Sequence, residues 1–198
     1  MYFDMAICII TYNRGKRALE NVENILKNIK KNFCVLVLNN GSNLGVEEYK
    51  KIENLSKENS QLFYKRHKTN IQVHGNFRSC FDFNNSKYIM ILSDEDFVNF
   101  DGLNDILDDL KNYNNVAACR TSIEPHKDLI TPGNSYIYPN EYFMAGVSAL
   151  NGFSFFGNYI SGIIYNLELI KKTDLLNILD RHINSHQSYP HLYFDLLV

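Results

Sequence analysis

Short apolar runs alternate with longer amphipathic stretches through the first 120 residues of the chain. Most of the runs are nearly continuous in apolar residues and have the length of strands that are buried on both faces. The longer stretches repeat apolar residues every three or four positions, which is the period of one helical face. The runs predict strands over 6–10, 34–38, 61–65, 88–92 and 116–120. The stretches predict helices over 17–31, 46–58, 75–84 and 101–113.

This alternation of strands and helices predicts an α/β fold. Parallel strands need long crossover connections, which are usually helical and right-handed. We therefore expect a mostly parallel, Rossmann-like central sheet flanked by helices, in a single domain. After residue 121 the rhythm changes, because prolines and glycine mark turns. There we expect a helix over 141–150, a strand over 159–166 and the start of a helix over 191–198.

Composition narrows the class of protein without naming a function. With 45% hydrophobic and 21% charged residues, the chain resembles a soluble globular protein. Its net charge of −2 argues against a nucleic-acid partner. Four widely spaced cysteines in apolar contexts indicate reduced, buried thiols of a cytoplasmic protein. The chain stops inside an apolar pattern, so we expect a truncated C-terminus whose missing tail contacts a membrane.

An acidic turn, Asp94-Glu95-Asp96, directly follows the apolar run 88–92. Three adjacent carboxylates repel one another, and a divalent cation would offset that repulsion because hard cations take oxygen ligands. The alternative is an acidic turn that caps the next helix. The turn alone does not distinguish the two interpretations.

Polar segments also follow the first two predicted strands: Thr11-Tyr12-Asn13-Arg14 and Asn39-Asn40-Gly41-Ser42. Ligands of doubly wound sheets bind beyond the carboxyl ends of the strands, so these segments and the acidic turn predict one site. Tyr12 could pack on a base, Asn40 could hydrogen-bond its edge, and Arg14 could offset phosphate charge. Gly41 would let the backbone turn tightly.

Three segments together resemble the family-2 glycosyltransferases of the GT-A fold: 6–14, 35–42 and 88–96. They are similar to the family's opening strand, its second strand with the nucleoside-binding turn, and the strand that leads into its DxD metal motif. Their order and separations also match. The resemblance implies an inverting, hexosyltransferase-type enzyme with a nucleotide-sugar donor, a UDP-sugar first, and Mg²⁺ or Mn²⁺ as cofactor.

The resemblance also implies roles for single residues. Asp94 would approach the ribose or donor sugar, and Asp96 would bind the metal, with Glu95 and Asp94 as further ligands. Asn39 stands where the family often has aspartate, and Gln72 lies near a position where glycine is common. Arg78 would reach phosphate or would be a surface arginine. The nucleoside pocket would be lined by Thr11, Tyr12, Arg14, Asn39 and Asn40.

An inverting displacement needs a base that takes the proton of the acceptor hydroxyl. The family usually places an aspartate for this at the start of a late helix, and the comparable segment here is 189–193. His191 occupies that position, and an imidazole with an ordinary pKa of about 6.5 is chemically competent. Asp180 and Asp195 are the rival bases, and a purely structural His191 is the alternative.

The resemblance divides the chain 1–198 into a nucleotide-sugar-binding half, about 1–120, and an acceptor-binding half, about 121–198. The segment 159–165 resembles a strand that flanks the family's acceptor site, and similar segments occur in bacterial surface-polysaccharide biosynthesis. A glycan or lipid-linked acceptor and a cytoplasmic site at the inner membrane face are therefore expected. Two other functions stay open: a metal-dependent phosphohydrolase and a non-catalytic nucleotide- or glycan-binding remnant.

Overall fold

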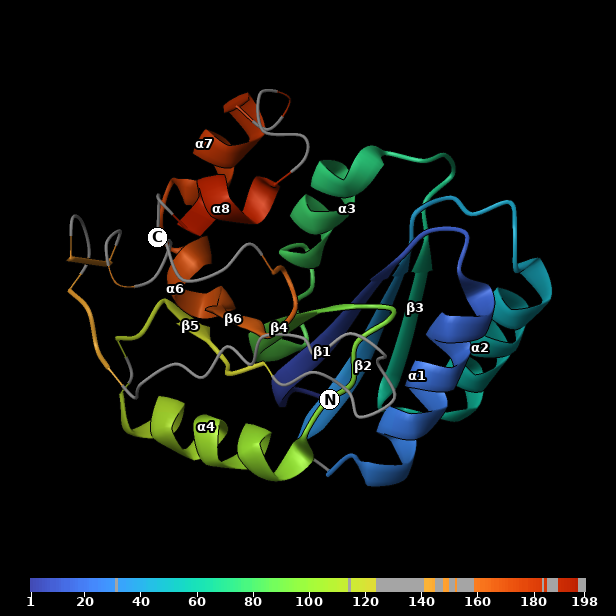
Figure 1. The fold of residues 1–198 in the computed structure, drawn as a ribbon, viewed down its shortest axis with the longest axis horizontal. Helices are drawn as coiled ribbons and strands as arrows, with labels where there is room; N and C mark the ends of the chain where they lie inside the picture. Colours follow the sequence, from blue (N-terminus) through green and yellow to red (C-terminus); the bar gives the residue numbers. More distant parts are fainter. Residues whose placement is uncertain are drawn as a thin grey trace, which may run out of the picture.

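The computed structural model describes residues 1–30, 32–113, 115–123, 141–144, 148–149, 152, 159–182, 184 and 189–195. Within these residues the chain builds a six-stranded sheet in the order β3-β2-β1-β4-β6-β5 (Figure 1). Its strands are β1 (Phe3–Thr11), β2 (Phe33–Asn39), β3 (Leu62–Arg66), β4 (Ser86–Ser93), β5 (Ala118–Arg120) and β6 (Ile163–Asn166). The first four strands are parallel, and β6 runs antiparallel to both β4 and β5. The predicted mostly parallel α/β sheet is confirmed.

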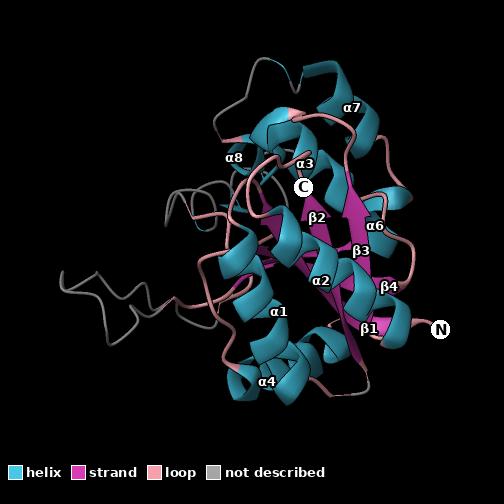
Figure 2. Cartoon of the chain, turned by 90° about the vertical axis from the view of Figure 1, so that its right-hand side faces the viewer, coloured by secondary structure: helices cyan, strands magenta, loops and turns pink. Residues whose placement is uncertain are grey.

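Helices cover both faces of this sheet (Figures 1 and 2). One apolar cluster joins the sheet to α1 (Gly15–Asn28), α2 (Val46–Glu58) and α4 (Phe100–Asn112). A second cluster joins the other face to α3 (Gln72–Cys80), α6 (Leu167–Lys171), α7 (Leu175–His182) and α8 (Pro190–Asp195). The sheet is therefore the middle of three layers.

The central strand β1 shows why its sequence is continuously apolar. Successive side chains of a strand point to opposite faces. Met5 and Ile7 accordingly belong to the first cluster, and Ala6 and Cys8 to the second. All four are fully buried, because helices cover both sides of the strand.

The predicted strands and helices of the first 120 residues are all present, with shifted ends. The largest shift is in α3, which begins three residues before the predicted 75 and ends at Cys80. The strand predicted over 159–166 begins only at Ile163, since residues 161–162 form a turn in which Gly162 has φ of +80°. Within the helix predicted over 141–150, residues 141–144 are not helical, residues 148–149 are helical, and residues 145–147 and 150 lie outside the described part.

Two short helices, α6 and α7, were not predicted. Each helix has at most eight residues, so its few apolar positions span too few turns to show a helical period. Residues 190–195 form the predicted final helix, and residues 196–198 lie outside the described part. Among the described helices, none is long and apolar enough to cross a membrane.

Candidate functional site

The carboxyl ends of β1, β2 and β4 lie side by side, as the polar segments after them predicted. The register pairs Thr11 with Asn39 of β2 and Ile10 with Ser93 of β4. The backbone N–H of Asn40 donates to the carbonyl of Thr11 at 2.9 Å. All three polar segments therefore meet at one edge of the sheet.

Asp94 is the buried centre of this edge, with only 4% of its surface exposed. Its Oδ2 accepts a hydrogen bond from Thr11 Oγ1 at 2.6 Å, and its Oδ1 lies 3.3 Å from Arg14 Nη1. Burial raises the pKa of the Asp94 carboxyl, while Thr11 and Arg14 act in the opposite direction. The polar contacts hold this carboxylate in one orientation against the end of β1.

Tyr49 of α2 completes a chain of hydrogen bonds that ends at Asp94. The Arg14 N–H donates to the Tyr49 hydroxyl at 3.1 Å, and that hydroxyl lies 2.7 Å from Thr11 Oγ1. Because Thr11 gives its own proton to Asp94, Tyr49 must donate to Thr11. Buried chains of this kind polarise and rigidify one another.

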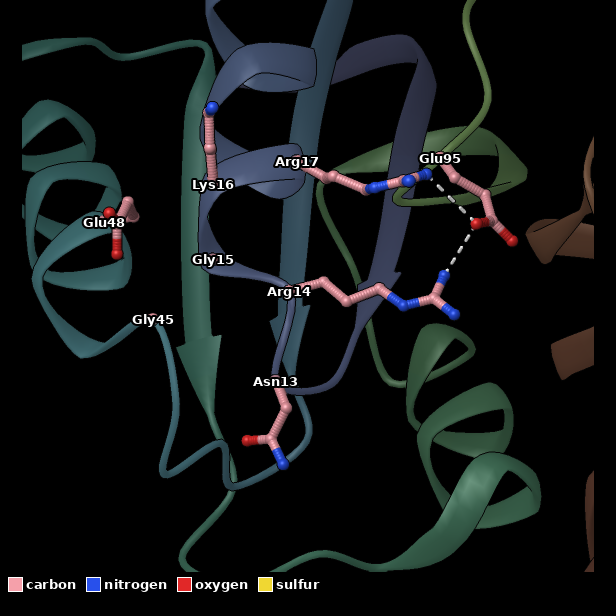
Figure 3. Close-up of a pocket in the computed structure, with 8 residues that line it drawn as sticks. All are labelled: Asn13, Arg14, Gly15, Lys16, Arg17, Gly45, Glu48 and Glu95. Carbon is pink, nitrogen blue, oxygen red and sulfur yellow. Dashed lines mark hydrogen bonds and ion pairs between the residues drawn. The ribbon is translucent and has the colours of Figure 1, made fainter. Parts of the chain in front are cut away.

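Glu95 points toward the two arginines at the start of α1. Its Oε2 lies 2.9 Å from Arg14 Nη1 and 3.3 Å from Arg17 Nη1, so two guanidinium groups converge on one oxygen (Figure 3). Asp94 and Glu95 together raise the pKa of Arg14. An open pocket of about 420 Å³ adjoins this cluster, between the N-terminal ends of α1 and α2. Its lining comprises Asn13, Arg14, Gly15, Lys16, Arg17, Gly45, Glu48 and Glu95.

Asp96 is half-buried and forms no ion pair with another described residue. Its Oδ2 accepts from Ser161 Oγ at 2.5 Å, and its carbonyl accepts from Asn21 Nδ2 at 2.7 Å. Burial raises the pKa of this carboxyl, the Ser161 hydrogen bond lowers it, and Glu95 raises it further. The structure therefore holds a desolvated carboxylate whose charge no described cation offsets.

The Asp96 carboxylate suits a divalent cation that is bound together with a phosphate-bearing ligand. No group of three histidine, cysteine, aspartate or glutamate side chains in the described part of the chain could by itself hold a metal ion. Mg²⁺ is commonly bound through one or two carboxylates plus substrate phosphates, without an all-protein cage. Asp96 fits that role, whereas the Glu95 carboxylate lies with two arginines.

The side chains of Asn39 and Asn40 build the loops of the site. Asn39 is fully buried, donates to the Tyr64 hydroxyl at 2.8 Å and accepts from the Ser42 N–H at 2.9 Å. Asn40 accepts from the N–H of Ile71 at 2.9 Å and donates to the carbonyl of Gln72 at 3.1 Å. Both amides therefore order the loops after β2 and β3 through contacts within the protein.

Asn13 joins the first two strand-end segments, a role that its place in the first of them did not by itself predict. Its Oδ1 accepts from the N–H groups of Asn43 and Leu44 at 2.9 and 3.1 Å, and its own N–H donates to Ser42 Oγ at 2.8 Å. The neighbouring Tyr12 is 42% exposed, so its ring is open to a ligand.

Three other residues at this edge were not predicted as site residues: Asn21, Tyr49 and Ser161. The sequence does contain a signal for Asn21, because it is a polar residue on the face of α1 that is otherwise lined by Ala18, Val22 and Ile25. It contains no such signal for Tyr49 and Ser161, since an inward tyrosine and a serine before a strand are ordinary features.

Arg78 and Asp180 form a two-point ion pair between α3 and α7. Arg78 Nε lies 2.6 Å from Asp180 Oδ1, and Arg78 Nη2 lies 3.1 Å from Oδ2. Arg78 also pairs with Asp82 at 2.9 Å. Of the two expectations for Arg78, the geometry matches the surface arginine more closely than the phosphate ligand.

Asp195 and His191 lie one turn apart on α8, and both are buried. Asp195 accepts from Arg120 Nη2 at 2.5 Å and from the Tyr165 hydroxyl at 2.6 Å. Burial raises the pKa of Asp195 to about 6, although Arg120 and Tyr165 oppose that shift. The His191 ring centroid lies 6.5 Å from that of Phe77 and 6.1 Å from that of Tyr189.

The six-stranded sheet, with helices on both faces and polar segments at the ends of its parallel strands, has the architecture of the GT-A class of α/β proteins. S. aureus TarS 1-349 in complex with UDP has a TM-score of 0.68 and 14% identity, over 98% of this chain and 54% of that one. The complex of TarS 1-349 with UDP-GlcNAc has a TM-score of 0.63 and 16% identity, over 87% and 48%. Mannosyltransferase PcManGT from Pyrobaculum calidifontis, in complex with GDP-Man and Mn²⁺, has a TM-score of 0.57 and 12% identity, over 87% and 47%.

The chain belongs to glycosyl transferase family 2, whose family model matches residues 6–172. It spans about half the length of these solved structures. No curated protein matches its sequence. The family resemblance carried by the three strand-end motifs is confirmed, and with it the GT-A fold.

Proposed function

We propose that the chain is an inverting, metal-dependent glycosyltransferase that moves a hexose from a UDP-sugar to a glycan or lipid-linked glycan. The observation that carries the proposal is the convergence of Thr11, Arg14 and Asp94 at the carboxyl edge of the sheet, in a chain of family 2. TarS has been solved with UDP and with UDP-GlcNAc, which supports uridine nucleotides as the first donors to test.

The proposed roles follow from what each side chain offers. The exposed ring of Tyr12 would pack on the base, and Asn39 and Asn40 would shape the loops around it. Asp94 would face the ribose or donor sugar, and Arg14 would face phosphate charge after leaving Glu95. Tyr49 would keep Thr11 and Arg14 in register during this exchange.

Asp96 would hold Mg²⁺ or Mn²⁺, with Asp94 as a further ligand. When bound, the cation would offset the charge of the nucleoside diphosphate that leaves. The raised pKa of Asp96 and the lack of a described cation beside it support this assignment. Mn²⁺ in the PcManGT complex is consistent with it.

The transfer step needs a proton acceptor. The acceptor hydroxyl oxygen would bond to the anomeric carbon while the bond from that carbon to the diphosphate oxygen breaks, which inverts the configuration. The hydroxyl proton would pass to the base, for which we propose His191. Asp180 and Asp195 are weaker choices because each lies in an ion pair with an arginine.

Calorimetry with UDP, with and without Mn²⁺, tests the donor and metal assignment. We expect Mn²⁺ to tighten UDP binding at least tenfold. Asp96→Asn should abolish this gain in affinity, because the variant keeps the size of the side chain and loses its charge. The matched control is Asp105→Asn on the exposed face of α4, which should bind as the wild type does. Equal UDP binding by the wild type with and without Mn²⁺ would contradict the metal dependence.

A second measurement tests the chemistry. Incubation with UDP-sugars and glycan acceptors should release UDP, and NMR of the product should show the opposite anomeric configuration to the donor. Phosphate release from simple phosphomonoesters would instead favour the phosphohydrolase, and binding without turnover across a donor and acceptor panel would favour the remnant.

His191→Ala should lower transfer by about 10²-fold or more while leaving UDP binding unchanged, because general bases contribute about that much. His182→Ala, at the exposed end of α7, is the control. Near wild-type transfer by His191→Ala would exclude His191 as the base.

We further propose that the enzyme acts in bacterial surface-polysaccharide assembly at the inner membrane face. Co-sedimentation with anionic vesicles would test the membrane association.

A further inference from the structure

The hydroxyl of Ser161 lies between the acidic turn and the end of β4. It donates to Asp96 Oδ2 at 2.5 Å and accepts from the backbone N–H of Ser93 at 2.9 Å. Because a backbone N–H can only donate, the serine proton is directed at the carboxylate. One oxygen of Asp96 is thereby engaged, and Oδ1 forms no hydrogen bond with the rest of the described chain.

The turn that carries Ser161 is itself held against the sheet. The Gly162 N–H donates to the Ile91 carbonyl at 2.9 Å, and the Gly162 carbonyl accepts from the Thr121 N–H at 3.0 Å. Gly162 has φ of +80°, and a Cβ there would lie 2.2 Å from Thr121 Oγ1. Only glycine fits this place without a rearrangement, so the position of Ser161 is strongly restrained.

The orientation of the Asp96 carboxylate therefore depends on a residue 65 positions further along the chain. An aspartate in a loop after a strand has several accessible side-chain rotamers. A partner that is only 9% exposed and anchored by Ser93 selects one of them. Partners of this kind set the geometry and the affinity of a ligating carboxylate.

We propose that Ser161 is a positioning residue, which fixes Asp96 so that its Oδ1 is presented to the divalent cation of the donor complex. The inference rests on the proposed function, because it assumes that Asp96 binds that cation. Ser161 belongs to the half of the chain assigned to the acceptor, and Asp96 to the half assigned to the donor. The hydrogen bond thus makes cation binding depend on the turn before β6.

The test compares Ser161→Ala and Ser161→Cys with Ser86→Ala. Ser86 is a suitable control because it is also buried, at the opposite end of β4, and its hydroxyl donates to the Tyr88 carbonyl at 2.8 Å. The cysteine variant keeps nearly the volume of serine and loses most of the donor strength, so it covers the case in which the alanine variant does not fold. Three quantities are measured: Mn²⁺ affinity in the presence of UDP, UDP affinity without metal, and the urea midpoint of unfolding.

We expect both Ser161 variants to weaken Mn²⁺ binding about tenfold, within the range of 10–100-fold found for such partners, and to leave metal-free UDP binding unchanged. Ser86→Ala should lower only the urea midpoint. If Mn²⁺ binds the Ser161 variants as tightly as it binds Ser86→Ala, the positioning role is overturned and Ser161 is structural. A wild type without Mn²⁺-dependent UDP binding would instead overturn the proposed function, so the two failures are distinguishable.

Discussion

Gln72 adopts a backbone conformation that suits glycine better than glutamine. Its φ is +64°, in the left-handed region that side chains with a Cβ rarely adopt. Asn40 and Asn70 help to hold this conformation, since Asn70 Oδ1 accepts from the Gln72 N–H at 2.7 Å and Asn40 donates to the Gln72 carbonyl. Glycine would adopt this conformation without the steric conflict that the Cβ of Gln72 creates.

Gln72→Gly should stabilise the chain by about 0.5–1 kcal/mol, because it removes the left-handed strain and the side chain is exposed. Urea unfolding followed by circular dichroism measures the change. Val73→Gly is the matched control, because Val73 is also exposed and does not have a positive φ. That control should lose stability, and a loss of similar size in Gln72→Gly would show that the φ of Gln72 carries no strain.

Helix α8 depends on tertiary contacts for its existence. It has only six residues, and isolated helices shorter than about 12 residues are marginal in water. Phe194 packs against Phe81 with ring centroids 4.7 Å apart, and Asp195 lies in a buried pair with Arg120. These contacts tie the helix that carries the proposed base to β5 and to the aromatic core beneath α3.

Asp195→Asn should lower the free energy of unfolding by about 3 kcal/mol at pH 7, because breaking a buried ion pair leaves a buried charge poorly compensated. Asp180→Asn breaks the exposed pair with Arg78 and should cost about 1 kcal/mol or less. Urea denaturation of the two variants side by side makes the comparison. Equal losses would mean that Asp195 holds α8 no more firmly than a surface pair does.

The three-layer architecture buries thiols from three different elements. Cys8 of β1, Cys34 of β2 and Cys80 of α3 are fully buried, and the sulfur atoms of Cys8 and Cys80 lie 3.4 Å apart. Burial raises the pKa of Cys34 to about 12. Because the thiolate is the reactive species, these cysteines should be inert while the fold is intact.

In a Cys119→Ser chain, thiol labelling should therefore follow unfolding of the whole molecule. We expect labelling to be at least about 10³-fold slower than that of free cysteine in buffer, since the unfolded fraction of a stable domain is 10⁻³ or less. In denaturant, all three thiols should label quickly. Rapid labelling in buffer would show that the layer between the sheet and α3 opens without global unfolding.

Local pattern was sufficient for much of the fold. Continuous apolar runs and helical periodicity identified the first five strands and four helices, because burial on two faces or on one stripe leaves its period in neighbouring residues. The order of the polar strand ends identified the edge at which Thr11, Arg14 and Asp94 meet. The family followed from those same three segments.

Tertiary structure alone decided which polar groups meet across long separations. Arg78 pairs with Asp180, which lies 102 residues further along the chain, and Arg120 pairs with Asp195, which lies 75 residues further along. The insertion of β6 between β4 and β5, which brings Ser161 to Asp96, likewise has no local trace. The sequence by itself determined the layers and the acidic turn at their edge, since both depend on short-range pattern. The partner of each carboxylate in that turn depends on the path of the whole chain.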